Sequence, residues 1–179
     1  MALRDEAQKI RGITPRGKFS IVEGIIVILA VSVLAMIVVP QFCSAKQQAR
    51  EIELKEDLRY LRTQIAVFRA QHQDVPPGYP YGNVYNTPTN DALAGQLAGR
   101  SDIACNVSPN PGPDFPYGPY LSQFPVNPIN GLATCKMVGN NEPMPNPDGS
   151  TGWIYKAQTQ ELMANVSGDD GAGTPLASY

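Results

Sequence analysis

Charge, and the residues that most often build catalytic and metal centres, are scarce in this sequence. Only 17% of the 179 residues are charged, and there are three cysteines and a single histidine, His72. These counts leave too few ligands for a His-rich metal site, and a Ser-His-Asp triad would depend on that one histidine. The formal net charge of −2 lacks the basic excess of a nucleic-acid-binding protein. The composition therefore argues against a Ser-His-Asp hydrolase, a His-rich metal site and a dedicated nucleic-acid-binding protein.

What the sequence does contain is divided unevenly along the chain. Residues 1–18 hold five basic residues against two acidic ones, and residues 19–40 are almost wholly apolar. Residues 41–73 are amphipathic and predict a helix. Residues 74–179 are dense in turn formers, and 14 of the 17 prolines lie between Pro76 and Pro147. We therefore expect a basic leader, an apolar helix, an amphipathic helix and a loop-rich domain, in that order.

The apolar segment has the length of a membrane span. Residues 19–39 rise about 30 Å as a helix, which is about the thickness of a hydrocarbon core. The basic residues before it predict a cytoplasmic N-terminus and export of the rest of the chain. A buried core helix and a cleaved secretory signal peptide are the alternatives. No small-x-small cleavage site follows the apolar run, which continues directly into the next predicted helix.

Apolar residues recur on one face of the second helix. They are spaced by four, three, four and three residues, as a helix packed on a core requires: Leu54, Leu58, Leu61, Ile65 and Phe68. Pro76, Pro77 and Gly78 predict its end, where His72 is expected to be a solvated C-terminal cation or a cap. Pro40 predicts a bend or local unwinding between the two helical halves, because proline cannot donate a backbone hydrogen bond to residue 36.

The start of the apolar segment resembles a known motif. Gly17, Lys18 and Phe19 precede Glu23, and the apolar run ends in Pro40, Gln41 and Phe42. The four-residue spacing from Phe19 to Glu23 and the 17-residue spacing to Pro40 are similar to the prepilin N-terminus. That motif belongs to type IV pilins and to the pseudopilins of type II secretion systems.

The resemblance implies how the chain would be processed and assembled. A prepilin peptidase would remove the leader at the cytoplasmic face, and the new N-terminal residue, Phe19 in the family pattern, would be N-methylated. The subunit would wait in the inner membrane and then enter a helical filament, driven by pilus or secretion assembly machinery. Glu23 would pair with the N-terminal amine of a neighbouring subunit and so set the axial register. Because Lys18 stands where the family has glycine, cleavage after Gly17 and cleavage after Lys18 both remain open.

The exported part predicts a small sheet. Residues 152–156 and 161–166 predict a hairpin, with Trp153 and Tyr155 on one face as a core pair. The Gly-Trp-Ile-Tyr sequence also resembles the hairpin near the C-terminus of major pseudopilins. Together these features predict an α+β fold in which a long N-terminal helix packs on a small, loop-rich antiparallel sheet, the lollipop shape of pilins.

Two kinds of stabilising site are expected in this exported domain. Cys105 and Cys135 predict a disulfide in an oxidising compartment, with two buried thiols as the alternative. Asp148, and Asp169 with Asp170, stand beside glycines and are candidate calcium ligands, with solvated turns as the alternative. Major pseudopilins are known for a C-terminal calcium site.

The sequence thus predicts a structural subunit of a type IV pilus or a type II secretion pseudopilus. The alternative is a signal-anchored periplasmic binding or enzymatic domain that does not polymerise. Glu23 favours the first hypothesis, because a plain anchor has no use for a carboxylate inside its apolar segment.

Overall fold

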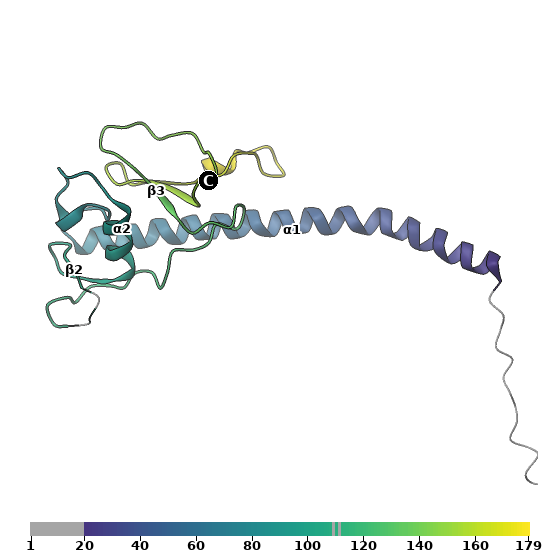
Figure 1. Ribbon diagram of the computed structural model, residues 1–179, viewed down its shortest axis with the longest axis horizontal. Helices are drawn as coiled ribbons and strands as arrows, with labels where there is room; N and C mark the ends of the chain where they lie inside the picture. Colours follow the sequence, from purple (N-terminus) through teal and green to yellow (C-terminus); the bar gives the residue numbers. More distant parts are fainter. Residues whose placement is uncertain (1–19, 109, 111) are drawn as a thin grey trace, which may run out of the picture. The chain divides into compact units, whose positions relative to one another are not determined.

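The computed structural model describes residues 20–108, 110 and 112–179, and the side chains of residues 37–43 are outside that description. The chain divides into two compact units, Met1–Cys43 and Ser44–Tyr179, and each is described by itself. One helix, α1 (Ile21–Gln71), contributes residues to both units. The other elements belong to the second unit, where α2, β2 and β3 gather around the C-terminal part of α1 (Figure 1).

In the second unit, α1 buries the stripe that the sequence predicts. Leu54, Leu61 and Phe68 have no exposed surface, and Leu58 and Ile65 have almost none. The helix ends at Gln71, two residues earlier than predicted. Gln73 and Asp74 adopt left-handed backbone conformations with φ of 54° and 67°, so the helix stops before the prolines are reached. The predicted amphipathic helix is confirmed.

A short helix and a two-stranded ribbon follow, and the sequence did not predict the helix. The 3-10 turn η2 (Pro80–Gly82) precedes α2 (Asn90–Ala98), whose first turn is capped where the Ala92 amide donates to Thr89 Oγ1 at 3.1 Å. Strands β1 (Arg100–Ser101) and β2 (Val107–Ser108) then pair antiparallel. We predicted only short strands here, and Thr89 was the available signal for a helix start.

The second sheet has three strands in the order β3, β4, β5: β3 (Cys135–Val138), β4 (Trp153–Lys156) and β5 (Glu161–Ala164). The antiparallel pairing of β4 with β5 confirms the predicted hairpin. Strand β3 pairs parallel with β4, so the sheet is mixed and the prediction of a purely antiparallel sheet is wrong. The long connection between Val138 and Trp153 allows this pairing, because a parallel neighbour needs a crossover rather than a tight turn.

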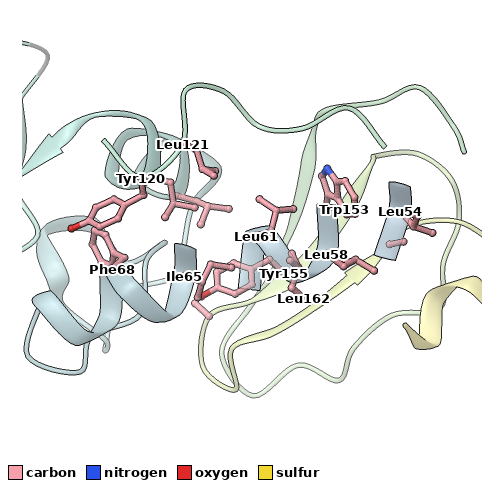
Figure 2. Close-up of a cluster of buried hydrophobic side chains, with 14 of the residues drawn as sticks. Leu54, Leu58, Leu61, Ile65, Phe68, Tyr120, Leu121, Trp153, Tyr155 and Leu162 are labelled. Atoms are coloured by element: carbon pink, nitrogen blue, oxygen red, sulfur yellow. The ribbon is translucent and has the colours of Figure 1, made fainter. Parts of the chain in front are cut away.

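The helix stripe and the sheet form one core. In Figure 2 the side chains of Leu54, Leu58 and Leu61 point towards Trp153 and Tyr155 of β4, and all of these belong to one buried cluster. Further along the helix, Phe68 meets Tyr120 edge to face, with ring centroids 5.4 Å apart. The predicted α+β class is therefore confirmed.

The chain ends in a loop and a 3-10 turn, η3 (Leu176–Ser178), that dock on α1. The Arg62 guanidinium donates to the Leu162 carbonyl at 2.8 Å and also to the Tyr179 carbonyl. The Lys55 ammonium lies 4.0 Å from the centre of the Tyr179 ring. These contacts hold the last residues beside the helix.

Candidate functional site

The N-terminal part of α1 exposes its apolar side chains on every face. From residue 21 to residue 36 each side chain is exposed, and the large apolar ones keep between 51% and 83% of their surface. They are Ile21, Val22, Ile25, Ile26, Val27, Ile28, Leu29, Val31, Val33, Leu34 and Met36. A contiguous apolar surface of this extent marks a protein or membrane interaction site. We take it as the candidate functional surface and call it the apolar helix surface.

Glu23 is the ionisable residue of this surface, and it lies in the first turn of α1. A carboxylate in a first turn is favoured by the helix dipole. Ser20 caps the same turn, since the Val22 amide donates to Ser20 Oγ at 3.3 Å and the Gly24 amide donates to the Ser20 carbonyl at 3.1 Å. No cation forms an ion pair with Glu23 among the residues that the structure describes. Its carboxylate is exposed beside apolar neighbours and can accept a partner from outside the chain.

Several sequence predictions fall outside what the structure describes. Gly17, Lys18 and Phe19, the expected processing site, lie outside the described residues, as does the leader of residues 1–18. Pro40 lies in α1, but its side chain is among those not described, and the bend expected there stays a prediction. Within the described part of the chain, no helix is long and apolar enough to cross a membrane.

The predicted disulfide is not formed, because Cys105 and Cys135 are free thiols in separate parts of the second unit. Cys105 lies in the loop between β1 and β2, packed against Gly82, and its carbonyl accepts from Gln96 Nε2 at 3.3 Å. Cys135 begins β3 and pairs with Trp153 in the other sheet. Burial raises the pKa of the Cys105 thiol to about 11 and that of Cys135 to about 12, so both are weakly reactive. The alternative of two shielded thiols is the one observed.

Asp148, one calcium candidate, already has protein partners. Its carboxylate accepts from the Ser150 hydroxyl at 2.6 Å, from Asn165 Nδ2 at 2.7 Å and from Lys136 Nζ at 3.0 Å. These donors, with Ser150 the largest contribution, hold the pKa of Asp148 well below its usual range. The cluster closes the turn before β4, and the fully buried Asn165 joins it to the end of β5.

Asp170 organises the loop before η3 in a similar way. Its carboxylate accepts from the Tyr179 hydroxyl at 2.6 Å and from the amides of Ala172 and Thr174 at 2.8 Å each. The Tyr179 hydrogen bond, the largest cause, helps to lower the pKa of Asp170 to about 2. Asp169 is exposed beside it. Over the described ranges no three His, Cys, Asp or Glu side chains are grouped to hold a metal, and the calcium site stays a prediction.

His72 is the residue whose environment the sequence did not reveal. We expected a solvated C-terminal cation or a cap at the helix end. The ring is not solvated: it is fully buried and stacks on Phe68 with centroids 3.8 Å apart. Nδ1 donates to the Phe68 carbonyl at 2.6 Å, so in the neutral ring Nε2 accepts from the Ser101 hydroxyl, 2.9 Å away. Burial lowers the pKa of His72, and the Phe68 carbonyl and the Asp102 carboxylate oppose that shift only in part.

We expect this ring to make the second unit less stable in mild acid. The unfolded chain binds a proton at the ordinary histidine pKa of 6.5, whereas the folded chain binds it at lower pH. The free energy of unfolding is therefore retained above pH 6.5 and lost as the pH falls from 6.5 through the folded-state pKa. The slope is at most about 1.4 kcal/mol per pH unit for one proton. Denaturant unfolding between pH 7.5 and 5 measures it.

The matched control for that experiment is His72→Gln, which keeps an amide able to hydrogen-bond but cannot titrate. Its free energy of unfolding should be lower than that of the parent at pH 7.5 but nearly flat down to pH 5. Asp148 and Asp170 titrate at lower pH, so they do not produce the same signal. An equal slope in parent and variant would show that His72 is not the responsible group.

Comparison with known proteins adds no relative to these observations. No family model, no curated protein and no solved structure matches the chain.

Proposed function

We propose that this chain is a structural subunit that polymerises through its N-terminal helix into a type IV pilus-like or type II secretion pseudopilus filament. The observation that carries the proposal is the apolar helix surface of residues 21–36, which no part of the described chain covers. Exposed apolar area of this kind is stable in water only when another apolar partner buries it. Lipid before assembly and the helices of other copies after assembly are partners of the required chemistry.

In this proposal the two halves of α1 have different tasks. The residues after Ser44 bury the stripe from Leu54 to Phe68 and so anchor the small sheet, whereas the exposed residues 20–36 would belong to the filament core. The subunit would have the lollipop form of a pilin, with an inner-membrane helix and an exported domain of residues 74–179. After leader removal by a prepilin peptidase and transfer by the assembly machinery, the domain would line the filament outside the inner membrane.

Glu23 sets the register between copies in this proposal. A carboxylate among packed apolar helices is strongly destabilised unless a cation pairs with it. The cations available near it in sequence are the new N-terminal amine at Phe19, or Lys18 if that residue is retained. Only one axial stagger brings such a cation to Glu23, so the pair selects the stagger even where it adds little net stability.

A catalytic role has less support than assembly. The Ser101 hydroxyl that contacts His72 has no exposed surface, so a substrate carbonyl cannot reach it. The proposal therefore assigns the chain no reaction, and it assigns no metal to Asp148, Asp169 or Asp170.

The test is electron microscopy of filaments from cells that produce the full chain, with mass spectrometry of the subunit N-terminus. We expect filaments containing the chain and a subunit that lacks the leader. A methylated Phe19 at the N-terminus identifies cleavage after Lys18, and an N-terminal Lys18 identifies cleavage after Gly17. A chain that stays anchored as separate subunits, with no filament under secretion conditions, would favour the non-polymerising anchored domain instead.

A further inference from the structure

Two flanks of α1 in the second unit carry opposite charge. The acidic flank is Glu53, Glu56 and Asp57, and the basic flank is Lys55, Arg59 and Arg62. Residues three, four and seven positions apart share one side of a helix. The buried stripe that starts at Leu54 lies between the two flanks, so they face outward on opposite sides of the helix.

The acidic flank is not neutralised by its own chain. Glu53 and Glu56 are exposed and Asp57 is half-buried, and no cation lies within ion-pair distance of them among the described residues. Burial raises the pKa of Asp57, and the negative charges of Glu53 and Glu56 raise it further. Three carboxylates crowd one another here and would be relieved by cations from another molecule.

The basic flank lines a groove of about 730 Å³ along α1. Its floor carries the small side chains of Thr63, Ala66 and Ala70, and Tyr179 forms one wall. The contacts of Lys55 and Arg62 with the end of the chain fix that wall. Arg59 is exposed and forms no ion pair within the part of the chain that the structure describes. The groove therefore offers both room for a helix flank and an unpaired cation.

We infer that the acidic flank of one copy docks in the groove along the basic flank of a second copy. The occupant is a second copy because one chain carries both complementary surfaces: three carboxylates unpaired within the described residues on one side of α1 and, on the other, a groove lined by the likewise unpaired Arg59. Such a contact is heterologous, since each copy uses one flank for the copy before it and the other for the copy after it. Contacts of this type extend into open helical assemblies unless they close into a ring.

This inference rests on the proposed function and deepens it, because it assigns surfaces of the exported part to the contact between filament subunits. Exposed ion pairs contribute little net stability individually. The ion pairs instead select the orientation in which two copies dock, because like-charged flanks repel each other and only an acidic flank facing a basic flank is tolerated. The apolar helix surface would supply most of the association, and the flanks would choose the side on which the next copy docks.

Cysteine cross-linking of the full chain in producing cells tests this. Two differently tagged variants, Glu56→Cys and Arg59→Cys, are produced together and treated with a mild oxidant. We expect a disulfide-linked dimer that contains one copy of each variant. Neither variant should form a dimer when it is produced alone, because a residue on one flank does not contact the same residue of another copy. The unsubstituted chain gives the background of cross-linking through the native cysteines. In the matched control, Asp114→Cys, at an exposed site outside α1, is produced with Arg59→Cys in place of Glu56→Cys.

Each outcome decides the inference. No product above background in the mixture overturns it, as does equal cross-linking of Glu56→Cys or Arg59→Cys alone, which indicates a two-fold contact. Filaments without the mixed product would leave the proposed function standing and reject this interface. The mixed product without filaments would support the interface and reject the filament.

Discussion

Replacing Glu23 by valine should leave a chain that inserts and folds normally but assembles poorly. Valine is at least as apolar as its neighbours, so neither the membrane partition nor the second unit should suffer. The variant loses the group that selects one stagger between copies. Filament yield should fall by about tenfold, which corresponds to a loss of about 1.4 kcal/mol in the preference for the productive stagger over the others. The measurements are filament mass sheared from cells, membrane abundance of the chain, and microscopy of any filaments that remain.

Two further variants separate charge from packing at that position. Glu23→Gln keeps the size and hydrogen-bonding atoms of the side chain but removes its charge, and it should fail as the valine variant does. Ser32→Val, on the same helix surface, also exchanges a polar side chain for valine. Its hydroxyl is already satisfied by the Ile28 carbonyl at 2.7 Å, so its filament yield should stay near that of the parent. Normal yield and unchanged symmetry with Glu23→Val would remove the register role from Glu23.

Trp153→Ala should have the largest effect on the stability of the second unit. The indole has no exposed surface and lies in the middle strand of the sheet against the stripe of α1 (Figure 2). Its Nε1 donates to the Pro125 carbonyl at 3.0 Å. Truncation leaves a cavity and removes the donor of a partly buried carbonyl. Comparable truncations cost about 3–5 kcal/mol, a large part of the total of about 5–15 kcal/mol that holds a typical domain folded. Denaturant unfolding followed by circular dichroism measures the loss.

The control for this variant is another aromatic residue with the opposite exposure. Tyr85 keeps 93% of its surface, so Tyr85→Ala should change the free energy of unfolding by no more than about 0.5 kcal/mol. Similar losses from both substitutions would mean that the core of the second unit is not centred on β4. Filament assays on Trp153→Ala would then also need a different interpretation, since a misfolded domain lowers yield without acting on the apolar helix surface.

Local patterns in the sequence determined the helices and hairpin that depend on them. The spacing of Leu54, Leu58 and Leu61 fixes one face of a helix through the 3.6-residue period, and the structure buries that face. Residues 152–166 fold back because the alternating side chains and the four-residue turn are neighbours in the chain. The apolar run and Glu23 are equally local, so the proposed function could be reached from the sequence. These features need no knowledge of distant residues.

Contacts between distant residues decided the rest. The parallel pairing of Cys135 with Trp153 joins strands separated by a long crossover, and no short-range pattern encodes it. His72 is buried only because Ser101 and Tyr120 fold against it, which reverses the expectation of a solvated side chain. Cys105 and Cys135 are free because packing places Cys105 in the loop between β1 and β2 and Cys135 at the start of β3, although their number and compartment suggested a pair. The positions of the two charged flanks on opposite sides of α1 follow from helix periodicity. The groove along the basic flank, in contrast, needs Tyr179 to line it from the far end of the chain. In each case the free energy comes from burial against residues far along the chain, which only the tertiary structure brings together.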